Sequence, residues 1–190
     1  MQTTKNSRTI ALVSILAALC LAIQLAPRPP NVEFTSLLAF TVGFIYGLFM
    51  GVFFGSFIML VNGFFSPWGF AGFNLPFQMV SMSLLGLIGG VYRRYAQSYN
   101  AAELCSGASI LGAFLTVIYD FVTNFGVALY AMISGVHPAL AVITVLASGA
   151  PMSLIHIVSN TIVFGIVFFP LIKALNHISM VRDTWLKREQ

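Results

Sequence analysis

Charged residues are scarce in this sequence. Only 7% of its 190 residues are Asp, Glu, Lys or Arg, whereas soluble domains carry roughly a quarter. Hydrophobic residues make up 58% of the chain, and apolar runs of about 20 residues recur, each long enough to cross about 30 Å of hydrocarbon. The composition excludes a sizeable soluble domain and predicts an all-α membrane protein built from spanning helices.

Catalytic and nucleotide-binding motifs are missing as well. No G-x-x-x-x-G-K-[ST] pattern occurs, so the chain does not hydrolyse ATP through a P-loop. H-E-x-x-H and G-x-S-x-G are absent, and the three histidines lack the spacing of metal ligands. The two cysteines, Cys20 and Cys105, fall in or beside apolar segments and are expected to be small buried side chains rather than a disulfide. We therefore expect neither an enzyme nor a metal site.

Six transmembrane helices are predicted in a single membrane domain. Their approximate ranges are 9–26, 34–48, 50–65, 76–94, 104–134 and 150–174. The second and third come from one charge-free run, 34–65, which as a single helix would span about 48 Å and exceed a simple crossing. Glycines recur within it every four residues, at Gly43, Gly47, Gly51 and Gly55. They predict a turn near Gly47–Gly51 and a close approach of the two helices.

The placement of Lys and Arg predicts the orientation. Both termini and the 93–102 linker carry nearly all the basic residues, so by the positive-inside rule they are expected in the cytoplasm. The net charge of +4 then reflects these segments and not nucleic-acid binding. Loops 27–33, 66–76 and 135–150 fall on the outer face, where 139–146, too short to cross, is interpreted as a surface or re-entrant segment. We expect a multi-pass protein of a prokaryotic-type plasma membrane.

Isolated polar side chains in apolar surroundings are the candidate binding residues, because burying them in a membrane is expensive. They are expected to gather beneath the 66–76 loop, whose aromatic side chains, Trp68, Phe70 and Phe73, could form a lid. The candidate set is Asn62, Trp68, Asn74, Gln78, Asp120, Asn124, His156 and Asn160. The set could form a ligand pocket or an internal structural network, and His156 suits a helix–helix hydrogen bond as well as a ligand contact. Arg28 and Glu33, at the rim, are expected to be solvated or paired.

The first helix has one smooth face. Ser14, Ala18 and Ala22 lie four residues apart, so three small side chains line up along the same side. Such faces allow helices to approach closely in lipid. This face suits either packing inside the chain or docking of a separate membrane subunit.

Several segments together resemble a known family of transport proteins. They are Pro29-Pro-Asn-Val-Glu33, Gly51 to Gly55, Asn62-Gly-Phe-Phe65, Pro67-Trp68-Gly69 and Pro76-Phe-Gln-Met79. In this order, between a small-residue first helix and the fourth helix, they resemble the substrate-binding S components of energy-coupling factor (ECF) vitamin transporters. Within that family they resemble the branch often assigned to cobalamin or related cargo.

The resemblance implies a six-helix S component that binds a vitamin or related micronutrient at its outer face, with no covalently bound cofactor. It would lie in membrane lipid and dock, through Ser14, Ala18 and Ala22, on a T subunit coupled to two ABC-type ATPase subunits. The main alternative is a self-sufficient secondary transporter of a small organic solute, which would be expected to show internal repeats or several ion-coupling carboxylates. An intramembrane enzyme and a purely structural subunit are the remaining alternatives.

Overall fold

The computed structural model describes residues 2–179, with side chains from 7 to 177, and the regular structure of this part is entirely helical. The elements are α1 (Gln2–Leu25), α2 (Thr35–Tyr46), α3 (Leu48–Phe65), η1 (Gly72–Asn74), α4 (Leu75–Tyr95), η2 (Ala96–Ser98), α5 (Ala101–Ile133) and α6 (Pro138–Ser179). Five of the helices are long and apolar enough to cross a membrane, and α2 is a shorter apolar helix of 12 residues. The predicted all-α, multi-pass membrane architecture is confirmed.

The short helix α2 forms the centre of the bundle. Every residue from Thr35 to Ile45 is buried, as expected for a helix that is hydrophobic all round. Phe40 packs edge-to-face against Phe164 and Phe168 of α6, with ring centroids 5.3 Å apart in both pairs. Because the other helices enclose it, α2 does not need the length of a lipid-exposed span.

Glycines hold α2, α3 and α4 together. The charge-free run breaks where Gly47, at φ 98°, makes the turn between α2 and α3 that its glycine spacing predicts. Beyond the turn the backbones touch: a Cβ added to Gly43 would overlap the carbonyl oxygen of Gly86, and one added to Gly86 would overlap that of Gly51. No residue but glycine fits at these crossings without moving a helix.

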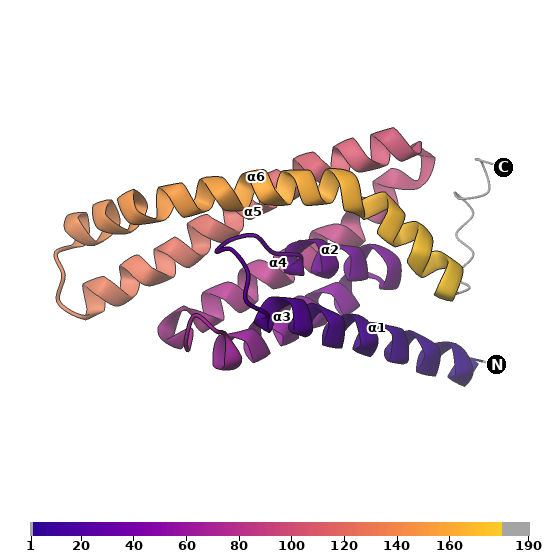
Figure 1. Ribbon diagram of the computed structural model, residues 1–190, viewed down its shortest axis with the longest axis horizontal. Coiled ribbons are helices and arrows are strands. Elements are labelled where there is room, and N and C mark those ends of the chain that lie inside the picture. The colour runs from indigo at the N-terminus through magenta and orange to yellow at the C-terminus, as the bar shows by residue number, and fades with distance from the viewer. Residues whose placement is uncertain (1, 180–190) are drawn as a thin grey trace.

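Helices α5 and α6 lie antiparallel beside this group and extend past it at one end (Figure 1). The start of α1 and the end of α6 lie together at the opposite end (Figure 1), as six crossings require. Arg93 belongs to that opposite end, in the last turn of α4, and its guanidinium donates to the carbonyl oxygen of Ile45, 2.6 Å away, at the end of α2.

The interpretation of residues 139–146 as a separate surface or re-entrant segment is wrong. These residues form the first turns of α6, which runs for 42 residues and includes Pro151 and Pro170. Pro138 opens the helix, where a missing N–H costs nothing. The predicted sixth helix, 150–174, begins beside Pro151, whereas α6 begins earlier and passes through this proline. Membrane helices tolerate an internal proline when their surroundings satisfy the freed backbone groups.

Candidate functional site

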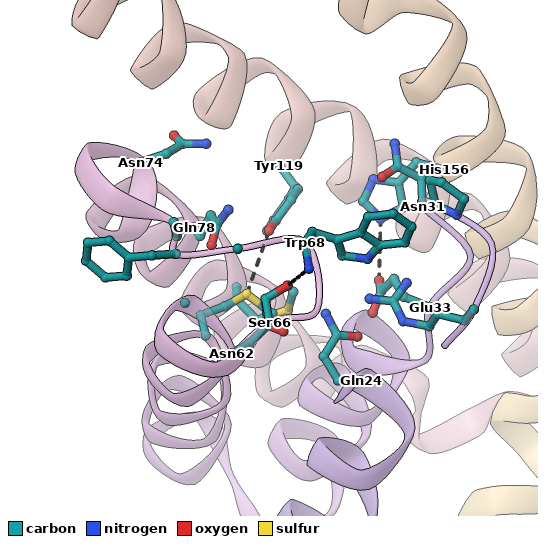
Figure 2. Close-up of a pocket in the computed structure, with 18 of the residues that line it drawn as sticks. Gln24, Asn31, Glu33, Asn62, Ser66, Trp68, Asn74, Gln78, Tyr119 and His156 are labelled. Atoms are coloured by element: carbon teal, nitrogen blue, oxygen red, sulfur yellow. Dashed lines mark hydrogen bonds and ion pairs between the residues drawn. The ribbon is translucent and has the colours of Figure 1, made fainter. Parts of the chain in front are cut away.

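A pocket of about 450 Å³ lies at the end of the bundle where α1 and α3 finish and α4 begins. Ligand sites in proteins typically measure roughly 300–1,000 Å³. The connections 26–34 and 66–71 form two of its sides, and side chains of α3, α4, α5 and α6 form the others (Figure 2). Five of the eight residues predicted for the site line this pocket: Asn62, Trp68, Asn74, Gln78 and His156.

The remaining three predicted residues lie between helices. Asp120 and Asn160 are joined to His156 and Glu33 by hydrogen bonds behind the pocket wall. Asn124 lies against Gly149 of α6 and does not line the pocket, so the expected convergence of the whole set under the loop is wrong for this residue. The α5 residues that line the pocket are Tyr119 and Val127, whereas Asp120 and Asn124 contact α6.

His156 links two carboxylates. Its Nδ1 lies 2.8 Å from Asp120 Oδ1 on α5, and its Nε2 lies 3.4 Å from Glu33 Oε1 in the α1–α2 connection. An imidazole can donate through both nitrogens only when it carries both protons. The two carboxylates therefore suit a cationic ring, which would bridge α5, α6 and the α1–α2 connection.

Glu33 is not solvated at the rim. It is only 6% exposed, and its carboxylate accepts from the backbone N–H of Ser36 at 3.0 Å and from the Ser36 hydroxyl. Burial by itself would raise the pKa of the Glu33 carboxyl, but the hydrogen bonds from His156 and Ser36 and the charge of His156 lower it well below its ordinary value. Of the two roles expected for this residue, solvated or paired, the structure shows the paired one.

Asn160 completes the network at its buried side. The side chain has no exposed surface, and its Nδ2 donates to Thr116 Oγ1 on α5 at 2.9 Å and to Glu33 Oε1 at 3.4 Å. Its own Oδ1, like Asp120 Oδ2, is buried without a hydrogen-bond partner among the described residues. The network is densely connected but leaves two acceptors unused.

The connection between α1 and α2 is fixed over one side of the pocket. Asn31, at φ 60°, donates through Nδ2 to the carbonyl oxygen of Met152 on α6 at 2.8 Å. Arg28 donates through Nη1 to the carbonyl oxygen of Val32, also at 2.8 Å. On α1 itself, Gln24 is buried and accepts from the Thr35 hydroxyl at 2.9 Å.

Sequence reasoning missed Gln24, Asn31 and Tyr119 as lining residues. Gln24 gave a usable signal, because a polar side chain near the end of an apolar helix needs a partner. Asn31 and Tyr119 gave none, since their positions depend on contacts with Met152 and Met59 that are distant in the sequence. The Tyr119 hydroxyl lies 3.7 Å from Met59 Sδ on α3 (Figure 2).

Two of the three proposed lid aromatics border the pocket. Trp68 and Phe70 line it while remaining 62% and 63% exposed, and the backbone N–H of Trp68 donates to Ser66 Oγ at 3.2 Å (Figure 2). Phe73 does not line the pocket, since its ring packs on Tyr130 of α5 at 5.7 Å. The open side of the pocket therefore includes a largely exposed indole ring.

The smooth face of α1 points away from the bundle. Ser14, Ala18 and Ala22 are all exposed, whereas Leu16 and Cys20, on the opposite side of the helix, are buried in the core. Of the two uses considered for this face, packing inside the chain is not the one the structure shows. The face is uncovered along the length of the helix.

Comparisons with known proteins agree with this architecture. Residues 8–168 match the family model described as ECF transporter, substrate-specific component. Comparisons with curated proteins and with solved structures give no match. The family match covers all six helices except the first residues of α1 and the last part of α6.

Proposed function

The chain belongs to the family of ECF transporter substrate-specific components, and from that premise we propose that it captures a vitamin or related micronutrient in the pocket beside Trp68. The members of this family are transport subunits that work with a T subunit and ATPases. We propose that this chain delivers its cargo through such a T subunit, powered by two ABC-type ATPase subunits.

The observation that carries the proposal is the pocket itself. It lies where three helices begin or end and two connections meet, so its walls can rearrange without unravelling a helix. Polar side chains, among them Asn62, Gln78 and His156, share the lining with apolar and aromatic ones such as Met59, Trp68 and Phe70, so the pocket can both orient a small molecule and cover its apolar surface. A purely structural subunit would have no use for a cavity of this size.

A cobalamin-type cargo is the finer form of the proposal. The segments around Trp68 support it by their resemblance, whereas the volume of about 450 Å³ suits a smaller molecule. A corrin ring with its nucleotide tail would fit only if the 66–71 connection moved outward. Cyanocobalamin therefore belongs among the compounds tested, as the largest of them.

The exposed small face of α1 supports docking of the T subunit. Ser14, Ala18 and Ala22 offer a partner helix a surface without large side chains, so two backbones can approach closely. The pocket is lined from α1 only by Gln24, near the end of the helix. Docking and cargo binding would thus use different parts of the same helix.

The test is retention of cargo by the purified chain. The protein in lipid nanodiscs is incubated with a mixture of water-soluble vitamins, washed, and its bound molecules identified by mass spectrometry. One vitamin should be retained, and Trp68→Ala should retain at least tenfold less, whereas Phe49→Ala, an exposed aromatic far from the pocket, should match the wild type. Retention of nothing by the wild type, or equal loss in both variants, would refute the proposal.

A further inference from the structure

The pocket is unusually rich in carboxamide side chains. Gln24, Asn31, Asn62, Asn74 and Gln78 all line it, and they come from α1, the α1–α2 connection, α3, η1 and α4 (Figure 2). Each carboxamide offers two N–H donors and one carbonyl acceptor in a plane. A surface made of such groups is complementary to a ligand whose own edge alternates donors and acceptors.

Three of these carboxamides have unused hydrogen-bonding capacity. Asn62 Oδ1, Asn74 Oδ1 and Gln78 Oε1 are buried and have no hydrogen-bond partner among the described residues. Arg28, which also lines the pocket, has a buried donor, Nε, that likewise lacks a hydrogen-bond partner among the described residues. Leaving such buried groups without a partner lowers stability. Asn74 Oδ1 lies against Gly126 of α5, so the carbonyls of Asn62 and Gln78 are the ones that matter here. A ligand that brought N–H groups to these two carbonyls and a carbonyl to Arg28 would recover that loss.

The charges around the pocket already balance one another. Arg28, Glu33 and His156 are its charged or titratable lining groups apart from the Tyr119 phenol, and Asp120 lies directly behind His156. When His156 carries both protons, as its two carboxylate partners favour, it and Arg28 supply two positive charges against the two carboxylates. A ligand with a net charge would therefore lack a counter-charge, and burying an unpaired charge is expensive.

We propose, building on the function proposed above, that the pocket selects uncharged molecules that present a carboxamide, lactam or ureide edge beside a flat or compact apolar body. The edge would bind the carboxamides of Asn62 and Gln78, and the body would rest on the exposed indole ring of Trp68. The charge-balanced group formed by Arg28, Glu33, His156 and Asp120 would exclude the corresponding acids.

Matched pairs of compounds test the proposal. Nicotinamide and nicotinate, pantothenol and pantothenate, and biotinamide and biotin each share a skeleton and differ by one negative charge. Each compound is dialysed against the full chain in nanodiscs and its bound fraction is measured by mass spectrometry. At least one neutral member should bind, and at least tenfold more tightly than its acid.

Binding of an acid as tightly as its neutral partner would overturn this proposal while leaving the transport function standing. Retention of none of the three neutral members would also overturn it. Failure of the function is recognised separately, because in that case the vitamin mixture leaves nothing on the protein either.

Near-isosteric variants locate the contact. Gln78→Glu and Asn62→Asp each replace a donor by a negative charge, and each should weaken binding of the retained neutral compound at least tenfold, which corresponds to about 1.4 kcal/mol. Gln97→Glu makes the same change at an exposed carboxamide outside the pocket and should leave binding within twofold. Unchanged binding in both pocket variants, measured on folded protein, would overturn the proposal, and either variant alone suffices if the other does not fold.

Discussion

Two parts of this bundle are held together in different ways. In the glycine-packed part, α2, α3 and α4 meet backbone against backbone at Gly43, Gly51 and Gly86. In the polar-linked part, α5, α6 and the 26–34 connection are joined through Glu33, His156 and their hydrogen-bond partners. The contacts in the glycine-packed part form only because glycine has no side chain, whereas those in the polar-linked part depend on specific side chains.

The two kinds of contact have different consequences. Backbone contacts offer no group that a ligand could compete for, so the glycine crossings keep α2, α3 and α4 in a fixed arrangement. A buried polar network is costly to maintain unless its members are satisfied, and here two of its members, Glu33 and His156, form part of the pocket wall. We infer that α2–α4 form a fixed frame that holds Asn62 and Gln78 in the pocket lining, and that any movement resides where the polar-linked part meets the pocket.

The largest effect is expected in the polar-linked part. His156→Leu would leave the Glu33 and Asp120 carboxylates buried without their shared partner, and breaking a buried ion pair in this way costs about 3–5 kcal/mol. The free energy of unfolding in detergent measures the loss. His177→Leu makes the same change at an exposed position near the end of α6 and should have almost no effect. Equal stability of both variants would show that the network is not what joins these elements.

The second-largest loss of stability is expected in the glycine-packed part. Gly86→Ala would force a methyl group against the Gly51 carbonyl oxygen, and overpacking of this kind costs roughly 1–3 kcal/mol. Gly165→Ala is the matched control, because its Cβ would meet only the Ser109 side chain, 3.3 Å away. Thermal unfolding of the two variants should differ clearly. If Gly86→Ala were as stable as the control, the backbones would not be as close as described.

A smaller loss of stability is expected at Asp120, where one substitution distinguishes a role in helix packing from a role in ligand contact. Asp120→Asn keeps an acceptor for His156 Nδ1 but removes the charge, so it should lower the free energy of unfolding by about 1 kcal/mol. Because Asp120 does not line the pocket, cargo affinity should change less than twofold. Loss of affinity at unchanged stability would assign Asp120 to the ligand instead of the helix contact.

The frame was predictable because its signals are local. Apolar runs, the charge-free length of 34–65 and glycines at four-residue spacing predicted the helices and the turn at Gly47 without any distant contact. Residues 139–146 were misassigned because this run was considered by itself and is too short to cross a membrane, whereas it is continuous with the rest of α6 through Pro151. Membrane helices can continue through a proline when their surroundings satisfy the freed backbone groups.

The site was predictable only in part because its contacts are distant in sequence. Helical spacing places Asp120 and Asn124 on one face, and the same holds for His156 and Asn160, but spacing does not say which neighbour the face meets. In α5 that face meets α6, and the pocket is lined instead by Tyr119 and Val127. The bond between His156 and Glu33 joins residues 123 positions apart, which no local pattern reveals.

The smallest effect on stability is expected on the exposed face of α1, which belongs to neither part. Ala18→Leu adds bulk where nothing in the chain packs, so the free energy of unfolding should stay within about 0.5 kcal/mol of the wild type. Cargo retention should also persist, because Ala18 does not line the pocket.

Under the proposed function, however, the same leucine would keep a T-subunit helix at a distance, so co-purification with the T subunit and ATPases should fall at least tenfold. Ala102→Leu, at an exposed alanine in the first turn of α5, should leave assembly intact. Intact assembly of Ala18→Leu would place the docking surface elsewhere, and a loss of cargo without a loss of assembly would mean that the two faces of α1 have been assigned the wrong way round.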